Sequence, residues 1–332
     1  MDVSVALCTF NGAQYLSPQL ETILSQTRRP DEIVVCDDGS TDTTLEILDT
    51  YADRYPNLFE IIHNERNLGV TKNFQQAINH CTGDVIAIAD QDDLWCEAKL
   101  SRQAEMIEST DVGFVTHDSH LFDNEANTIA DAEKGTRLWE TRYRPHEGEA
   151  CRDQQAAFSE TVRRNFIQGA SIMFRADLRE HLLPIPDCWQ YDYFLAVVAL
   201  ATTNVYDFPQ PMAYYRQHDD QHLGGVVSSP LAKVRREWNR GFDEYSRRCH
   251  AWEQLQARLA AIPPEEMYLQ KESVMTTVDT YCEYICQRAA IHNPSLSRRG
   301  RFAAWLSNNR RYRHHVFGHP VYSITDLSGL LG

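Results

Sequence analysis

Short apolar segments of strand character alternate with helical segments over about the first hundred residues of this chain. Strands are expected at 3–7, 32–36, 59–62 and 84–89, and apolar residues recur at helical spacing in the intervals between them. Such alternation favours parallel βαβ units with right-handed crossovers. In sheets of this kind, ligands collect beyond the carboxyl ends of the strands. The sequence therefore predicts an α/β fold with a ligand site at that edge.

Two acidic loops occupy this predicted edge. One follows the second strand at 37–42, and the other lies in the run Ile-Ala-Ile-Ala-Asp-Gln-Asp-Asp-Leu-Trp at 86–95. Carboxylates at the end of a buried strand repel one another and are poorly solvated, so a cation normally lies between them. Oxygen ligands suit Mg²⁺ or Mn²⁺, which bind few protein carboxylates together with a substrate's phosphates. A solvated acidic turn with an aspartate helix cap is the alternative.

Composition and charge exclude several classes of protein. The formal net charge of −15 argues against nucleic-acid binding through the phosphate backbone. No window approaches the roughly 18 apolar residues of a membrane span. The start at Met1 lacks the regions of a signal peptide, so we expect a cytoplasmic location. The 9 cysteines are scattered and several lie in apolar runs, which indicates reduced thiols; Cys282 and Cys286 share a predicted helix face but lack a second pair at zinc-finger spacing.

A basic segment lies near the end of the chain. Residues 298–315 carry arginines at both ends, with Phe302, Trp305 and Leu306 between them. A basic helix with this apolar spacing could rest on an anionic membrane surface, here the inner face of the cell membrane, or could mediate a homodimer. We prefer the interpretation that residues 298–315 form an ordinary amphipathic helix packed on its own domain.

Several short motifs resemble, in order, those of the family 2 glycosyltransferases, which use nucleotide-diphosphate sugars. The matching motifs are Cys-Thr-Phe-Asn-Gly at 8–12, Ser-Gln-Thr at 25–27, Asp-Asp-Gly-Ser-Thr-Asp at 37–42, Asn67, Gly69, Asn73, Gly-Asp at 83–84, Asp-Gln-Asp-Asp-Leu-Trp at 90–95, Ile-Gln-Gly at 167–169, Tyr-Asp-Tyr at 191–193 and Tyr-Arg-Gln-His at 215–218. The forms at 90–95 and 215–218 look most like the bacterial rhamnosyltransferase-like members. The resemblance implies the GT-A fold, a Rossmann-like mixed sheet flanked by helices.

The same resemblance sets the expected domains. It covers residues 1–225, which would form the glycosyltransferase domain, with a nucleotide-sugar half at 1–110 and an acceptor half at 111–225. Residues 226–332 match more loosely, and their apolar spacing predicts a mainly helical C-terminal extension.

The resemblance also implies the donor site. Asp92 would bind the divalent metal directly, and Asp90 would contact the donor ribose or the metal shell. His218 could be a metal or diphosphate ligand, although a surface histidine is equally expected. Asp38 would accept a hydrogen bond from the pyrimidine base, and Phe10 would stack on that base unless it is a core aromatic. The other expected donor contacts are Thr9, Asn11, Arg66, Asn67, Lys72 and Gln91, although a solvated loop position is equally expected for Arg66. Asp93 and Asp42 are expected to cap helices rather than to bind ligands.

Asp192 is the expected general base. Family members carry an acidic residue at the start of this helix, although many have Glu-Asp where this chain has Tyr191-Asp192. A helix N-cap is the competing role for Asp192. One carboxylate on the acceptor side, without a second nucleophile, implies a single displacement with inversion.

The predicted function is therefore a metal-dependent inverting glycosyltransferase. The motifs favour a dTDP-6-deoxyhexose such as dTDP-rhamnose as donor, with UDP-sugars next. The expected acceptor is a hydroxyl of a surface polysaccharide such as lipopolysaccharide, or of a lipid-linked saccharide. A non-catalytic nucleotide-sugar-binding or scaffold protein is the alternative. A dinucleotide oxidoreductase is disfavoured because the turn at 8–13 lacks Gly-x-Gly-x-x-Gly.

Overall fold

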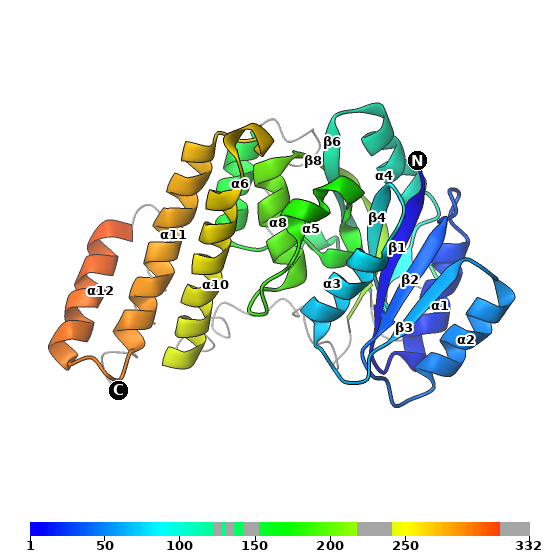
Figure 1. Cartoon of the computed structure of the whole chain (residues 1–332), viewed down its shortest axis with the longest axis horizontal. Coiled ribbons are helices and arrows are strands. Elements are labelled where there is room, and N and C mark those ends of the chain that lie inside the picture. Colours follow the sequence, from blue (N-terminus) through cyan, green and yellow to red (C-terminus); the bar gives the residue numbers. More distant parts are fainter. Residues whose placement is uncertain (123–127, 130–135, 142–152, 218–240, 313–332) are drawn as a thin grey trace. The chain divides into compact units, whose positions relative to one another are not determined.

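A mixed sheet organises the larger part of the chain (Figure 1). The computed structural model describes residues 1–122, 128–129, 136–141, 153–217 and 241–312. Within these residues the sheet has 8 strands in the order β3-β2-β1-β4-β7-β6-β8-β5. The chain divides into two units, Met1–Ala157 with Phe166–Gly224 and Phe158–Asn165 with Gly225–Gly332, which are described separately.

The first four strands of the sheet are parallel, as the alternating sequence pattern predicts. They are β1 (Val3–Thr9), β2 (Glu32–Asp37), β3 (Phe59–His63) and β4 (Val85–Asp90), and the helices between them are α1 (Ala13–Leu24), α2 (Thr44–Arg54) and α3 (Val70–His80). From β1 the chain moves outward to β2 and β3, then returns to the other side of β1 for β4. Because each crossover is right-handed, α1 and α2 cover one face of the sheet and α3 covers the other (Figure 1).

The second half of the sheet mixes strand directions. Its elements are β5 (Leu94–Trp95), α4 (Lys99–Ser109), β6 (Val112–Phe122), α5 (Leu138–Thr141), the 3₁₀ turns η1 (Gly169–Ser171) and η2 (Ala176–Leu178), β7 (Met173–Arg175), α7 (Arg179–Leu182), α8 (Tyr191–Thr202) and β8 (Asn204–Arg216). Strand β7 is antiparallel to β4 and to β6, while β6 and β8 are parallel. Strand β5 is antiparallel to β8. The predicted mixed sheet flanked by helices is confirmed.

The hydrophobic core explains why the central strands are apolar along their whole length. Val3, Val5 and Leu7 of β1 face one cluster, which also contains Leu16 of α1 and Leu100 of α4. The alternate residues of β1 and β4 point to the opposite face, where they are also buried. When both faces of a sheet are covered, every successive residue of a strand is buried, so apolar residues are needed on both sides of each strand.

The second unit is helical, as predicted for the C-terminal region. It contains α10 (Phe242–Ala261), η3 (Pro264–Glu266), α11 (Lys271–His292) and α12 (Arg298–Tyr312), and α6 (Gln154–Arg163) runs from the first unit into it. Helices α10 and α11 pack as an antiparallel pair with Trp252, Leu255 and Val278 buried. The buried Arg288 donates a hydrogen bond of 2.8 Å to the Tyr245 hydroxyl. None of the helices in the described ranges is both long and apolar enough to cross a membrane.

One expectation about the cysteines is wrong. Cys249 of α10 and Cys286 of α11 form a disulfide, although they are separated by 37 residues. The antiparallel pairing of the two helices brings them together, with their Cα atoms 4.7 Å apart. The other cysteines that the structure describes are not disulfide-bonded, and Cys8, Cys36 and Cys81 are buried in the first unit as predicted.

Candidate functional site

The two acidic loops lie at the same edge of the sheet, as the sequence predicts. In the parallel register of β1 with its neighbours, Cys8 pairs with Asp90 of β4 and Thr9 pairs with Asp37 of β2. All three strands therefore end at one level, and the loops that follow them lie at the same edge of the sheet. This edge is also where ligands bind in doubly wound sheets.

Three carboxylates crowd together at this edge. Burial, followed by the nearby charges of Asp92 and then Asp192, raises the pKa of Asp90 to about 8. Asp92 follows β4, whereas Asp192 belongs to α8, a hundred residues later in the chain. Oxygen-only donors that repel one another fit a hard divalent cation such as Mg²⁺ or Mn²⁺. The residues expected to hold the metal and the residue expected to act as base therefore lie near enough for their charges to interact.

Asp192 occupies the first turn of α8. The N-cap position is held by Gln190, and Asp192 lies two residues further on. Its Oδ1 accepts a hydrogen bond of 2.6 Å from the backbone N–H of Tyr193. A carboxylate at a helix N-terminus is stabilised by the unpaired N–H groups of the first turn. The side chain is only partly buried, so it keeps access to solvent.

Tyr191 packs beside the carboxylates and explains why residue 169 is a glycine. Its hydroxyl lies 3.5 Å from Asp90 Oδ1, and its ring stacks on Phe74 of α3 with the centroids 3.9 Å apart. A Cβ atom added at Gly169 would lie 1.8 Å from the Tyr191 hydroxyl oxygen. The group that approaches Gly169 is therefore a tyrosine ring, and only glycine leaves room for it.

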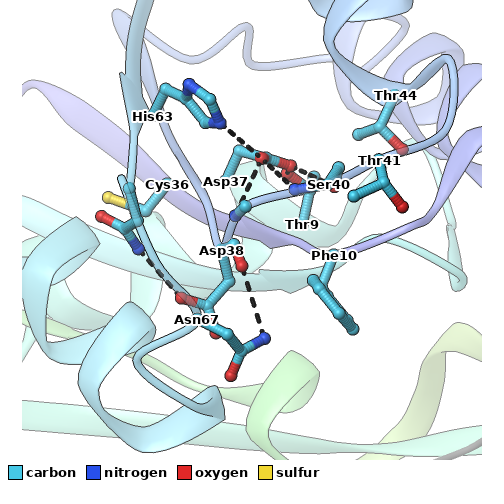
Figure 2. Close-up of polar contacts among 12 residues, drawn as sticks. Thr9, Phe10, Cys36, Asp37, Asp38, Ser40, Thr41, Thr44, His63 and Asn67 are labelled. Carbon is cyan, nitrogen blue, oxygen red and sulfur yellow. Dashed lines mark hydrogen bonds and ion pairs between the residues drawn. The ribbon is translucent and has the colours of Figure 1, made fainter.

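The predicted base-binding loop is held by hydrogen bonds to Asp38. Its Oδ1 accepts hydrogen bonds from Leu68 N at 2.7 Å and from the Asn64 amide at 3.0 Å, and its Oδ2 accepts one from Gly69 N at 2.9 Å. An ionised carboxylate accepts about four hydrogen bonds, so Oδ2 has capacity for one further donor. Phe10 and Asn67 lie on the same side of this loop as Asp38 (Figure 2).

Asp37 performs a different task from Asp38, because it fixes the turn itself. Its carboxylate is fully buried and accepts hydrogen bonds from Thr9 Oγ1 at 2.8 Å and from Ser40 N at 2.8 Å, and His63 Nε2 lies 3.8 Å away (Figure 2). Thr9, an expected donor contact, thus uses its hydroxyl to hold Asp37. Asn11, another expected contact, accepts a hydrogen bond of 2.8 Å from the backbone of Thr41.

Asp42 caps helices, as predicted. Its Oδ1 accepts a hydrogen bond of 3.0 Å from the N–H of Thr44, the first residue of α2. Its Oδ2 accepts one of 3.1 Å from the N–H of Ala13, the first residue of α1. One carboxylate therefore serves the N-termini of two helices.

Gln91 links the loop that follows β4 to the loop that follows β1, which carries Phe10. Its side-chain oxygen accepts a hydrogen bond of 2.9 Å from Phe10 N, and its side-chain nitrogen donates one of 3.1 Å to Phe10 O. A Cβ atom added at Gly12 would lie 2.1 Å from the Gln91 side-chain oxygen. The Gln91 amide is thus occupied by backbone, and it sets the distance between Phe10 and the carboxylates on either side of Gln91.

Asp93 is not a helix cap, so that prediction is wrong. It is fully buried and is followed by the strand β5, while α4 begins only at Lys99. Its carboxylate accepts hydrogen bonds from Arg216 N at 3.2 Å and from the Gln168 side chain at 3.3 Å. Burial, with the charges of its two aspartate neighbours, raises its pKa well above the usual value.

Arg216 is a site residue whose role the sequence did not reveal. Its guanidinium lies between the rings of Tyr15 and Phe122, 4.7 Å and 4.5 Å from their centroids. Its Nε donates a hydrogen bond of 2.8 Å to the carbonyl oxygen of Asp92. The sequence feature that pointed to Arg216 was the Tyr-Arg-Gln-His motif at 215–218. Only the pairing of β5 with β8 shows which loop Arg216 supports.

Of the remaining residues expected to contact the donor, Lys72 and Asn67 bond to other parts of the protein. Lys72 forms an ion pair of 2.7 Å with Asp187 and donates a hydrogen bond of 2.9 Å to Ile185 O, so its ammonium group is occupied by the segment before α8. Arg66 is exposed, and Asn67 donates a hydrogen bond of 3.3 Å to Asp38 O. His218 lies outside the described residues.

Comparisons with known proteins agree with this architecture. Residues 4–183 match the family model described as glycosyl transferase family 2. An uncharacterised protein of Mycobacterium tuberculosis is 28% identical over 246 residues, which cover 71% of this chain and 63% of that protein. The chain thus spans less than two thirds of that relative's length. The dTDP-rhamnosyl transferase RfbG of Shigella flexneri is 24% identical over 248 residues, which cover 70% of this chain and 81% of RfbG.

A solved structure shares the fold. The crystal structure of S. aureus TarS residues 1–349 in complex with UDP-GlcNAc matches with a TM-score of 0.53 and 16% identity, covering 99% of this chain and 91% of TarS 1–349. This likeness concerns the fold alone, and it confirms the predicted GT-A architecture. Because the family model covers more than half of the sequence, the chain belongs to glycosyl transferase family 2.

Proposed function

We propose that this chain transfers a sugar from a nucleoside diphosphate to a saccharide hydroxyl, with a divalent cation and with inversion at the anomeric carbon. The observation that carries the proposal is the convergence of Asp90, Asp92 and Asp192, from two distant elements, at the edge where β1 and β4 end. A transferase of this kind needs charge neutralisation beside the departing diphosphate and a base beside the acceptor. The three carboxylates supply both.

The acidic loop is suited to hold the cation. Asp92 and Asp90 offer oxygen ligands, and Arg216 fixes the Asp92 backbone through its carbonyl oxygen. A divalent cation held there stabilises the negative charge that develops on the diphosphate. The elevated pKa of Asp90 supports this assignment, because a cation relieves the repulsion that keeps its proton bound.

Asp192 would act on the acceptor. In the proposed step, one Asp192 carboxylate oxygen takes the proton of the acceptor hydroxyl while the acceptor oxygen bonds to the anomeric carbon. The bond between that carbon and the diphosphate oxygen breaks, and the diphosphate leaves with its electron pair. A single displacement from the opposite face inverts the anomeric configuration. The N–H of Tyr193 donates a hydrogen bond to Asp192 Oδ1 and orients the carboxylate for this role.

The donor base would bind between Asp38 and Phe10. The remaining acceptor capacity of Asp38 Oδ2 suits an imide N–H of uracil or thymine, and Gln91 holds Phe10 in place as a stacking surface. The similarity to RfbG, named as a dTDP-rhamnosyl transferase, favours a dTDP-6-deoxyhexose, and UDP-sugars are the next candidates. The acceptor class we propose is a bacterial surface polysaccharide or a lipid-linked saccharide.

A peripheral membrane contact would suit a lipid-linked acceptor. In α12, Phe302 is 49% exposed and stacks on Trp305, and the neighbouring Arg298 and Arg299 are exposed. Arg301 of the same helix is buried, which supports the preferred interpretation that α12 packs on its own unit. Sedimentation with anionic vesicles tests the contact, and a Phe302→Ser variant should sediment less.

The function is tested first by a thermal-shift screen of nucleotide sugars, with and without Mn²⁺. A true donor binds the folded chain and raises its melting temperature. Asp192→Asn should keep this shift and lower the rate of nucleoside diphosphate release by about 10²- to 10⁴-fold. Asp53→Asn, at an exposed position on α2, is the matched control and should behave like the wild type.

The same experiment separates the alternative function. A non-catalytic nucleotide-sugar-binding or scaffold protein would give the thermal shift but no transfer in the wild-type chain. Normal transfer by Asp192→Asn would instead reject the assignment of the base while leaving the donor site intact.

A further inference from the structure

The disulfide between α10 and α11 belongs to a larger group of metal-ligating side chains. One helical turn beyond Cys249 on α10 lies Glu253, and one turn before Cys286 on α11 lies Cys282. Because the helices are antiparallel, these two residues stand opposite each other in the register set by the disulfide. A hydrogen bond of 2.7 Å from Gln256 to Asp279 continues the same register one turn further on.

Distances show that three of these four side chains lie close together, and Cys282 lies one helical turn from them. One ligand atom each from Cys249, Glu253 and Cys286 lies within 4.8 Å of the others. The Cys249 sulfur lies 3.8 Å from Glu253 Oε1. The thiol of Cys282 is buried, and burial, followed by the charge of Glu253, raises its pKa to about 11. We call Cys249, Glu253, Cys282 and Cys286 the α10–α11 thiol cluster.

The donor set of this cluster has a definite chemical preference. Two sulfurs and one carboxylate oxygen lie together, and the sulfur of Cys282, one helical turn from Cys286, would complete a set of four. Such a set matches the soft and borderline ligands that bind Zn²⁺ in a tetrahedron, with Zn–S bonds of about 2.3 Å. Each helix contributes two ligands at i and i+4, which places them on one face of that helix. The exposed Glu253 gives an ion access from solvent.

We propose that the reduced chain binds Zn²⁺ through the α10–α11 thiol cluster, and that the Cys249–Cys286 disulfide and the bound metal exclude each other. The disulfide removes two of the three sulfurs from the donor set, because a sulfur in an S–S bond is no longer a thiolate. The cluster then has two states: cross-linked without metal, and reduced with metal. The proposal does not depend on the function proposed for the first unit.

The exchange between the two states is balanced in atoms and electrons. A dithiol reductant breaks the S–S bond and supplies two electrons and two protons, so that Cys249 and Cys286 become thiols and the reductant becomes a cyclic disulfide. Zn²⁺ binding then displaces the thiol protons to solvent. In the reverse direction, a disulfide oxidant takes two electrons and re-forms the Cys249–Cys286 bond, and the metal is released.

The test uses the full chain in two redox states, with Co²⁺ as a spectroscopic probe and Zn²⁺ as competitor. The protein is reduced with a phosphine, which does not itself supply thiolate ligands. The reduced chain should develop the intense thiolate-to-cobalt charge-transfer band at one equivalent, and Zn²⁺ should abolish it. The oxidised chain should show no such band. Aspartates give no thiolate band, so metal bound at Asp90 and Asp92 does not interfere.

Variants identify the ligands. Cys282→Ser is informative because Cys282 is outside the disulfide, so the variant can still form the Cys249–Cys286 bond. Loss of a partner that only supports a ligand costs about 10- to 100-fold in metal affinity, so loss of a direct ligand should weaken Zn²⁺ binding by at least about 10-fold. Glu253→Gln, at an exposed position, should weaken it without affecting folding. Cys188→Ser replaces an exposed cysteine of the other unit and should have no effect. A reduced wild-type chain without the band, or a band unchanged in Cys282→Ser, would overturn the proposal.

Discussion

Gly169→Ala should reduce catalysis through Tyr191, although residue 169 itself contributes no side chain. The new Cβ atom would lie 1.8 Å from the Tyr191 hydroxyl oxygen, so the ring must retreat by about 1.6 Å to reach ordinary contact. The ring is already stacked on Phe74 at 3.9 Å, and Asp192 is the next residue in the chain. The displacement is therefore passed to the proposed base.

The expected loss can be given as a magnitude. A misplacement of 1 Å in a catalytic group costs about 10²-fold in rate, which corresponds to about 2.7 kcal/mol of activation free energy. Overpacking should also lower the free energy of unfolding by about 1–3 kcal/mol. We expect kcat for sugar transfer to fall about 100-fold, while the thermal shift caused by the donor persists. Initial rates of nucleoside diphosphate release and urea denaturation measure the two effects.

Two companion variants sharpen this test. Gly241→Ala makes the same chemical change where a Cβ atom meets nothing within 4 Å, and it should leave the rate unchanged. Tyr191→Phe in the Gly169→Ala background removes the closest contact, but the ring carbon Cζ would still be 2.5 Å away, so the rescue should be partial. Wild-type transfer by a folded Gly169→Ala variant would refute the reasoning.

Three other outcomes are expected. Asp92→Asn should abolish metal-dependent release of nucleoside diphosphate; full wild-type activity with a chelator present would contradict the metal role. Gln91→Ala leaves the Phe10 backbone groups without their partner and should raise the KM for the donor about tenfold, with a smaller change in kcat. Burial lowers the pKa of Lys99 from 10.5 to about 7. Between these pH values the unfolded chain therefore binds more protons at Lys99 than the folded chain does. The free energy of unfolding should rise with pH in this range, by at most about 1.4 kcal/mol per pH unit. Lys99→Met should remove this rise in urea melts at pH 7, 8 and 9, and a slope unchanged in the variant would be evidence against it.

The parts of the fold that the sequence predicts depend on local signals. Apolar runs bounded by Pro30 and Gly83, with helical spacing between them, are enough to give parallel βαβ units and the edge at which they end. The convergence of the two acidic loops follows, because parallel strands present their carboxyl ends together. Asp42 as a helix cap is equally local, since its partners include the first helical residue of α2, two positions later.

The parts that the sequence does not predict depend on pairings between distant segments. Asp93 has the spacing of a helix cap, but β8 pairs with β5 and supplies Arg216 as a partner more than a hundred residues later. The disulfide likewise depends on the register of two antiparallel helices, which apolar periodicity does not determine. The close approach of Tyr191 to Gly169 likewise joins two segments that are 22 residues apart, and no local signal in the sequence identifies the tyrosine.

The attachment of α3 to the segment before α8 has a kinetic consequence. Lys72 bonds to Asp187 and Ile185, and the Thr71 hydroxyl donates a hydrogen bond of 2.7 Å to Trp189 O. This first turn of α3 directly follows Gly69, whose N–H is bonded to Asp38. A nucleotide that orders one loop thereby orders the other. We therefore expect compulsory-order addition, with the nucleotide sugar first, and product inhibition by the nucleoside diphosphate that is competitive with the donor alone.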